Sequence, residues 1–181
     1  MKIKLILIAS LTIFVSTVFA QKLTRQETIN YINEKLNEAE ALRWKNEGVY
    51  GKTTLTTNDF QTDSNRLNHV VYFNNMIIQD RESYSSFKVQ SFFNPSKISR
   101  IVIDSTKTTT DVGSFYIYFN DKNPLIISNN SSTNSSNKQR SDYITVYYKQ
   151  SDKLMYERLS KAFLHLKDLA KAAEKPDPFA N

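Results

Sequence analysis

Residues 152–173 read DKLMYERLSKAFLHLKDLAKAA, and this stretch decides the fold class. Its apolar side chains recur every three or four positions: Met155, Leu159, Ala162, Leu166, Leu169 and Ala173, with Phe163 and Ala170 widening the stripe. That spacing matches the 3.6-residue period of an α-helix, and Glu157, Lys161, Asp168 and Lys171 occupy the opposite face. Burying the larger apolar side chains contributes on the order of 10 kcal/mol before entropy. The pattern predicts a C-terminal helix that docks on the rest of the protein and ends before Pro176 and Pro178.

Residues 49–149, which precede this helix, have the alternating pattern of β-strands. The expected strands cover residues 53–57, 67–73, 76–79, 87–93, 101–103, 115–119, 125–127 and 143–148. Asn74 and Asn75 are expected to form a tight turn, because asparagine tolerates positive φ. No helical crossover separates the strands, which argues against a parallel sheet.

An N-terminal helix is expected to begin at Thr24, which forms a capping box with Glu27. Its apolar stripe consists of Ile29, Ile32, Leu36 and Ala39. Gly48 is the expected end, with Arg43 and Lys45 near the negative end of the helix dipole. The predicted fold is therefore α+β: an N-terminal helix, an antiparallel sheet or partly closed barrel of about seven strands, and a C-terminal amphipathic helix docked on it.

Two polar segments are expected to be loops. Residues 128–142 read SNNSSTNSSNKQRSD and contain no apolar side chain to offset the cost of ordering the backbone, which predicts a mobile hairpin loop. Residues 105–111, STKTTTD, form a shorter stretch of the same kind.

The first 20 residues have the pattern of an export signal. Lys2 and Lys4 precede an apolar run over residues 5–19, and the small residues Val18 and Ala20 predict cleavage after Ala20. The alternative is an uncleaved anchor, but a run of about 15 residues is shorter than the roughly 20 that a helix needs to cross a bilayer. We expect a signal peptide at 1–20, one α+β domain at 21–175 and a flexible tail at 176–181.

Composition excludes several classes of function. The chain has no cysteine, which rules out disulfides, thiolate metal sites, a cysteine nucleophile and an N-terminal lipid anchor. Three glycines do not make a phosphate-binding loop. The net charge of +6, lowered by two on loss of Lys2 and Lys4, is too small to indicate nucleic-acid binding. An exported chain without disulfides favours a bacterial envelope, periplasmic or secreted.

No side chains form a recognisable reactive motif. His69 is expected on an alternating strand and His165 on the flank of the C-terminal helix, and neither belongs to a metal-binding pattern. The acidic pairs Asp59 with Asp63 and Asp80 with Glu82 lack the spacing of a calcium loop, and Ser160-Lys161 is not a nucleophile motif. Lys138 and Arg140 are too few for a specific phosphate or anionic-lipid site. We therefore predict no catalytic residue, no metal ligand and no cofactor.

The aromatic residues are the best candidates for binding. Phe92, Phe93, Phe115, Tyr116, Tyr118, Phe119, Tyr147 and Tyr148 fall in the β region. Successive residues of a strand point to opposite faces, so Tyr116 and Tyr118 lie opposite Phe115 and Phe119. The phenylalanine side is expected to fill the core. The tyrosine side is either covered by one of the helices or exposed as a platform for a sugar, a peptide or a protein.

Three stretches, residues 27–33, 93–98 and 157–166, resemble small exported bacterial proteins of uncharacterised function. The order of short strands closed by a C-terminal helix is also similar to pleckstrin-homology-like barrels, in which that helix plugs the open end. The additional N-terminal helix and the absence of a basic loop depart from that pattern, so the resemblance does not extend to phosphoinositide binding.

These observations favour an exported, non-catalytic binding or interaction module whose ligand is a protein, peptide, glycan or lipid. One alternative is a small envelope hydrolase using carboxylates or a histidine site, for which His69, His165 or paired acids should converge in a pocket. Another is a lipid-binding protein of the membrane surface. No nucleic acid and no transmembrane segment after signal cleavage are expected, and the oligomeric state stays open.

Overall fold

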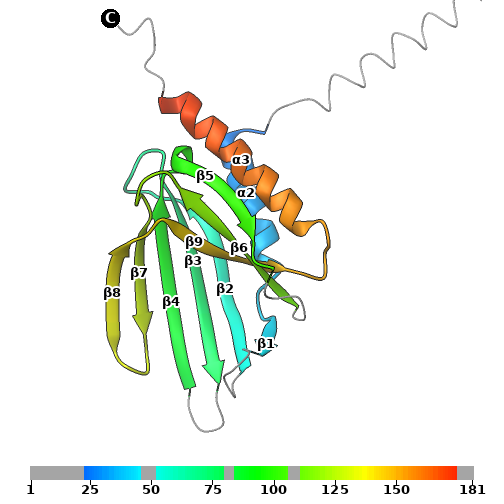
Figure 1. Ribbon diagram of the computed structural model, residues 1–181, viewed down its shortest axis with the longest axis vertical. Coiled ribbons are helices and arrows are strands. Elements are labelled where there is room, and N and C mark those ends of the chain that lie inside the picture. The colour runs from blue at the N-terminus through cyan, green and yellow to red at the C-terminus, as the bar shows by residue number, and fades with distance from the viewer. Residues whose placement is uncertain (1–22, 46–51, 80–83, 106–110, 175–181) are drawn as a thin grey trace, which may run out of the picture.

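The computed structural model describes residues 23–45, 52–79, 84–105 and 111–174 (Figure 1). The two helices are α2 (Arg25–Asn37) and α3 (Met155–Glu174), and a short 3-10 helix, η1 (Pro95–Lys97), precedes β5. The strands are β1 (Arg43–Lys45), β2 (Lys52–Thr62), β3 (Val70–Gln79), β4 (Tyr84–Phe93), β5 (Ile98–Ile103), β6 (Val112–Phe119), β7 (Leu125–Asn130), β8 (Ser135–Arg140) and β9 (Tyr143–Lys149). None of the helices within these ranges is sufficiently long and apolar to cross a bilayer.

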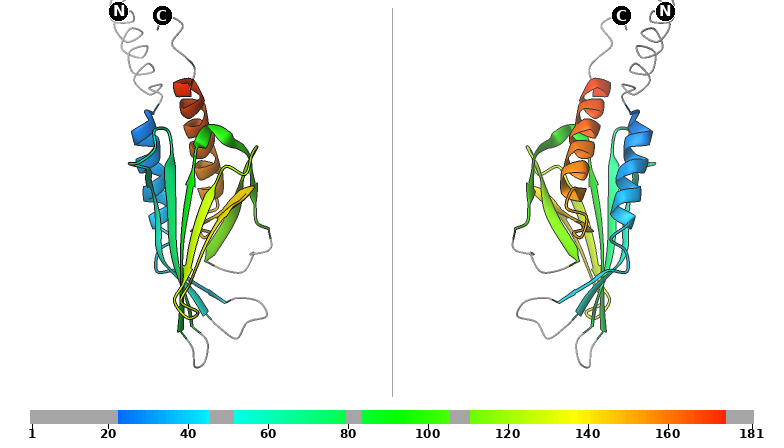
Figure 2. Two further views of the ribbon diagram at one scale, coloured as in Figure 1. Left: turned by 90° about the vertical axis from the view of Figure 1, so that its left-hand side faces the viewer. Right: turned by 90° about the vertical axis from the view of Figure 1, so that its right-hand side faces the viewer.

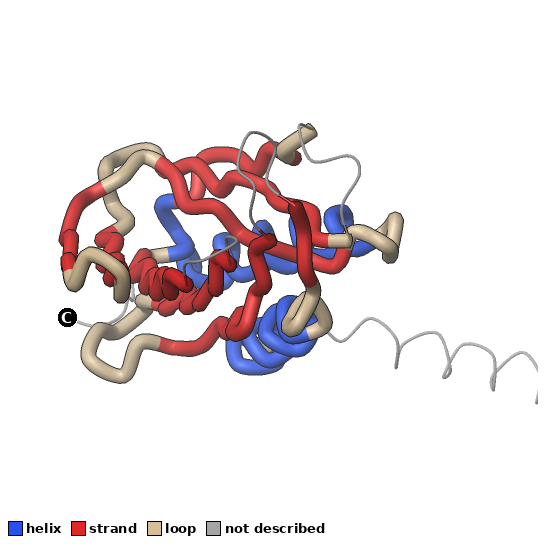
Figure 3. Tube along the Cα trace, turned by 90° about the horizontal axis from the view of Figure 1, so that it is seen from below, coloured by secondary structure: helices blue, strands red, loops and turns tan. Residues whose placement is uncertain are grey.

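The strands form two antiparallel sheets. The larger sheet has the order β1-β2-β3-β4-β7-β8, and the smaller one has the order β5-β6-β9. Figure 2 shows the smaller sheet as a second layer beside the larger one, with α3 along the opening between them. Seen from below, the helices lie away from the β7–β8 hairpin (Figure 3). The α+β prediction is confirmed, and the strands form two sheets rather than a closed barrel.

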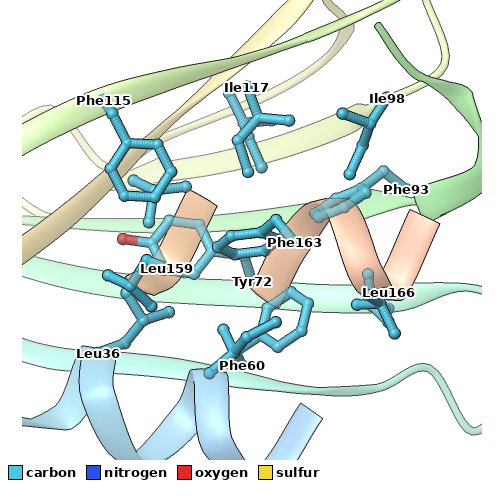
Figure 4. Packing of buried hydrophobic residues seen from close by; sticks show 14 of the residues in the cluster. Leu36, Phe60, Tyr72, Phe93, Ile98, Phe115, Ile117, Leu159, Phe163 and Leu166 are labelled. Carbon is cyan, nitrogen blue, oxygen red and sulfur yellow. The ribbon is translucent and has the colours of Figure 1, made fainter. Parts of the chain in front are cut away.

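A single large hydrophobic core joins both sheets and both helices. Phe163 of α3 is fully buried at its centre and contacts Phe60 of β2 edge-on, with ring centroids 5.3 Å apart. It also meets Phe115 of β6 at 6.0 Å, so one side chain connects the two layers (Figure 4). Such a contact set makes α3 part of the core rather than a peripheral cover.

The edge of β2 is covered by α2 and by the segment that follows it. Asn33 Oδ1 accepts a hydrogen bond from the backbone N–H of Phe60 at 2.7 Å, and Glu40 Oε1 accepts one from that of Asn58 at 2.9 Å. Side chains thus satisfy backbone donors that an adjacent strand would otherwise pair. This prevents edge-to-edge association with another chain.

The predicted capping box is confirmed, but the helix ends earlier than expected. Thr24 and Glu27 bond reciprocally at the start of α2, whereas the last helical residue is Asn37 and not Gly48. Ala41 adopts a left-handed φ of 61°, and its N–H donates to Leu55 O at 2.7 Å. The chain therefore leaves the helix to pair with β2, and Arg43–Lys45 form β1 instead of the helix end.

The predicted turn at Asn74-Asn75 is wrong. Both residues lie within β3, which pairs along its whole length with β2 and β4. Asn74 is buried, and Asn75 O accepts the Thr56 hydroxyl at 3.0 Å. Long partners on both sides outweigh the local preference of asparagine for turns, which is a weak prior in a sheet.

The strand expected to begin at Leu67 begins instead at Val70. Leu67 is 90% exposed and His69 precedes the strand, both in the β2–β3 turn. Asn68 takes a left-handed φ of 63° there. The true hairpin turn is thus placed several residues before the predicted one.

The polar stretch 128–142 is not a mobile loop. It contains the end of β7, the whole of β8 and a four-residue turn between them. Backbone pairing with β4 and then β7 orders it, and every β8 side chain is exposed. An exposed polar strand is suited to the free edge of a sheet, a position that requires no apolar face.

The buried face of α3 is rotated slightly from the predicted stripe. Its buried residues are Met155, Leu159, Phe163, Leu166 and Ala170. Ala162 is only partly buried beside the fully buried Phe163, and Ala173 is exposed in the last turn of the helix. The expected signal peptide at 1–20, the tail at 176–181 and the pair Asp80 and Glu82 lie outside the described residues.

Candidate binding face of the three-stranded sheet

The outer face of the smaller sheet carries a cluster of tyrosines and one arginine. Arg100 of β5, Tyr118 of β6 and Tyr143 of β9 form one row across the three strands. Val102 and Tyr116 lie in the next row. We call Arg100, Val102, Tyr116, Tyr118 and Tyr143 the tyrosine face.

The side chains of the tyrosine face hold one another in place. The rings of Tyr116 and Tyr143 meet at right angles with centroids 5.5 Å apart, and Tyr118 lies 5.6 Å from Tyr143. The Arg100 guanidinium lies 4.4 Å from the centroid of the Tyr118 ring, within cation–π range. Because these contacts restrict ring rotation, a ligand binding here loses less side-chain entropy than it would on isolated tyrosines.

Asp104 holds the Tyr116 hydroxyl in place from beneath the tyrosine face. Its Oδ2 accepts hydrogen bonds from the Ser114 hydroxyl at 2.8 Å and from the Tyr116 hydroxyl at 3.1 Å. Burial, followed by this bond, raises the pKa of Tyr116 above its ordinary value. The phenol therefore stays protonated at neutral pH and acts as a hydrogen-bond donor, not as a base.

The tyrosine face is open to solvent. Tyr143 is 44% exposed, Arg100 and Val102 are exposed, and Tyr116 and Tyr118 are half-buried. The large buried apolar side chains of α2 and α3 belong to the core that includes Phe115 and Ile117, on the other side of this sheet. The possibility that a helix covers Tyr116 and Tyr118 is therefore wrong.

Three other tyrosines of the β region, Tyr72, Tyr147 and Tyr148, are buried or half-buried. Tyr148 is buried in the main core, and Tyr147 packs on a smaller cluster with Leu55 and Val112. Tyr72 is 1% exposed, and its hydroxyl donates to Asn58 Oδ1 at 2.6 Å and accepts from the Tyr147 N–H at 3.2 Å.

Asn58 completes this buried polar network. Its Nδ2 donates to Leu36 O at 2.7 Å and to Tyr147 O at 3.0 Å, so one side chain links α2, β2, β3 and β9. Tyr147 lies on β9, an edge strand of the smaller sheet, and Leu36 O also accepts the Ala39 N–H at 3.0 Å. The network fixes the position of the smaller sheet on the larger one.

Each histidine contacts a backbone carbonyl. In the β2–β3 turn, His69 Nδ1 lies 3.0 Å from Leu67 O. His165 is on α3, and its Nε2 lies 2.9 Å from the carbonyl oxygen of Leu23, which precedes α2. In each case a ring nitrogen contacts a backbone carbonyl, so the side chain helps to position that part of the backbone. The hollow between α2 and α3 contains His165, yet neither His69 nor a carboxylate lines it.

Among the acidic and basic candidates, Asp63 and Arg140 form hydrogen bonds with the backbone. Asp63 Oδ1 accepts the Asn65 N–H at 2.9 Å and shapes the β2–β3 turn, while Asp59 lies along β2. Lys138 and Arg140 lie on one face of β8, and Arg140 donates to Asn123 O at 3.0 Å. Within the described ranges, no group of three or more histidine and carboxylate residues has the geometry to hold a metal ion.

Sequence reasoning found Tyr116 and Tyr118 but missed their neighbours. Tyr143 is the cross-strand partner of Tyr118, a relation that only the register between β6 and β9 reveals. Arg100 and Asp104 come from β5 and from the residue just after it, and no local pattern connects them to the tyrosines.

No family model matches the sequence, and no curated protein or solved structure matches it either.

Proposed function

We propose that this chain is a non-catalytic binding module that engages a protein or peptide partner through the tyrosine face. The observation that carries the proposal is the mutual packing of Tyr116, Tyr118 and Tyr143 beneath the Arg100 guanidinium at a solvent-exposed surface. Tyrosine and arginine are the residues most enriched among the energetic hot spots of protein interfaces. The face offers apolar area, hydroxyl groups and one cation, and the Asp104 carboxylate beneath it bonds Tyr116 and Ser114.

A protein partner fits this face better than a sugar does. A stacking platform for sugars needs ring faces that are free, whereas here rings pack edge-on and Arg100 lies over Tyr118. Val102 of β5, 39% exposed, gives the face aliphatic surface beside the rings. Aromatic, aliphatic and guanidinium groups in one patch match the core and rim of a protein interface.

The module is proposed to act outside the cytoplasm, and the leader-like residues 1–20 support that location. The resemblance to small exported bacterial proteins and to pleckstrin-homology-like barrels is kept as part of the same proposal. The proposal attributes binding, rather than catalysis, to the smaller sheet.

The proposal is tested by capture of partners from an envelope extract of the host, followed by affinity measurement with the purified partner. Wild-type protein, Tyr118→Ala, Arg100→Ala and the control Leu67→Ala, altered in an exposed turn, are compared. We expect wild type and Leu67→Ala to retain the same partner. Truncation of Tyr118 or Arg100 should weaken binding by about tenfold or more, as for a hot-spot residue.

Equal binding of that partner by all four proteins would contradict the assignment of the tyrosine face. Because the side chains of Tyr118 and Arg100 both contact solvent, we expect these variants to fold. Circular dichroism of each variant checks this.

A further inference from the structure

A second concave site lies on the larger sheet, on the side of β4, β7 and β8. It is a hollow of about 300 Å³ at the end of the sheet where the β7–β8 turn lies. Its lining consists of four serines, three asparagines and Lys88. No carboxylate and no aliphatic side chain takes part, so the hollow is built almost entirely from neutral hydrogen-bonding groups and a single cation.

The wall of the hollow is held in place by the backbone. Ser86 and Ser131 bond twice, through Ser131 N–H to Ser86 O at 3.0 Å and Ser86 N–H to Ser131 Oγ at 2.8 Å. Asn130 Oδ1 accepts from the N–H of Ser132 at 3.0 Å. The turn between β7 and β8 is therefore docked on β4, and a ligand meets a preformed surface.

Several polar groups of the hollow are available to a ligand. Lys88, Asn129 and Ser136 make no side-chain hydrogen bond to any residue in the described part of the chain. The cross-strand register places Lys88 beside Asn129 and Asn129 beside Ser136. Together they present an ammonium, an amide and a hydroxyl in one row, both donors and acceptors.

An exposed aromatic ring stands at the margin of this polar surface. Tyr84 is 65% exposed and lies two residues before Ser86, on the same face of β4. In contrast to the rings of the tyrosine face, it makes no ring contact with another described aromatic residue. Its flat face is therefore free for stacking.

We propose that this hollow and Tyr84 form a saccharide-binding site that prefers a carboxylate-bearing sugar. Hydroxyl and amide groups pair with sugar hydroxyls, and a free phenol ring stacks on the C–H face of a pyranose. Lys88, with no acidic side chain in the hollow, attracts a sugar carboxylate. The site lies on the other sheet from the tyrosine face, so it does not depend on the proposed function of that face.

The test is titration of the ¹⁵N-labelled protein with trigalacturonate and, separately, with the neutral maltotriose. We expect trigalacturonate to shift the amide signals of residues 86–88 and 129–136 and to bind more tightly than maltotriose. Tyr84→Ala should weaken trigalacturonate binding by about tenfold, while Tyr84→Phe keeps the ring and binds as wild type. Lys88→Gln should reduce trigalacturonate binding to the level of maltotriose.

The control variant Tyr143→Ala, on the other sheet, should bind trigalacturonate as wild type does. The saccharide site is overturned if neither sugar shifts these signals, or if Tyr84→Ala binds as wild type. Equal affinity of wild-type protein for the two sugars overturns the preference for a carboxylate. Because Tyr84 and Lys88 are exposed, unchanged signals elsewhere in each spectrum show that the variants are folded.

Discussion

Tyr72 and Tyr116 lie in different sheets and both donate a hydroxyl hydrogen bond, but their surroundings differ. Tyr72 is 1% exposed, and its oxygen bonds Asn58 and the backbone of Tyr147. Tyr116 bonds Asp104 at the edge of a half-buried cluster that faces solvent. A buried tyrosine such as Tyr72 thus joins the two sheets through its hydroxyl. A tyrosine with an accessible ring, such as Tyr116, offers a binding surface instead.

The largest expected effect comes from removing the centre of the inner network. Asn58→Ala leaves the Tyr72 hydroxyl without its acceptor and the Tyr147 carbonyl without this donor, whereas Leu36 O keeps the Ala39 N–H at 3.0 Å. At about 1–3 kcal/mol for each of these two groups, we expect a loss of about 2–6 kcal/mol in the free energy of unfolding. Denaturant unfolding measures it. Asn129→Ala, at an exposed position, is the matched control and should change stability by less than about 0.5 kcal/mol.

A smaller but more direct test compares the loss of one hydroxyl in each environment. Tyr72→Phe removes the partner of Asn58 Oδ1 inside the core and should cost about 1–3 kcal/mol. Tyr116→Phe leaves Asp104 with the Ser114 hydroxyl and near water, so we expect a cost below about 1 kcal/mol. Equal losses in thermal or denaturant unfolding would show that the two tyrosines are not distinguished by burial.

The third prediction concerns alkaline pH. Burial raises the pKa of Tyr147 to about 12, and burial also raises the pKa of Tyr72. Above the ordinary value of about 10, the unfolded chain loses phenol protons that the folded chain keeps, so stability falls as pH rises. The contribution is complete below pH 10 and declines by at most about 1.4 kcal/mol per pH unit for each group.

Tyr147→Phe removes one of these groups and should flatten the fall in stability between about pH 10 and 12. Leu67→Ala, which changes an exposed turn residue without a titrating group, is the control and should leave that slope close to the wild-type one. Urea unfolding at a series of pH values gives both slopes, and identical slopes for the two variants would contradict the role of burial.

The sequence indicated elements well where the signal was local or periodic. The capping box at Thr24 requires only Glu27 three residues later, and it is present. The spacing of the apolar residues placed α3 correctly, since a 3.6-residue period needs no knowledge of the partner. The missed strands are β1 and β8, which are short or wholly polar and have no periodic apolar face.

The errors share one cause. Asn74 and Asn75 look like a turn, and residues 128–142 look like a loop, because local composition contains no information on neighbouring strands. In the folded chain, pairing with β2, β4 and β7 satisfies their backbone groups and orders them. Pairing over long sequence separation outweighs residue preference in sheets.

By itself, the sequence determined the two helices, the antiparallel β character of the middle and the separation of Phe115 from Tyr116 onto opposite faces, because these follow from periods of 3.6 and 2 residues. Only the tertiary structure decided that Arg100, Tyr118 and Tyr143 share one row and that both helices pack on the phenylalanine side. Strand register and the choice of buried face depend on contacts between distant segments, which no local pattern specifies.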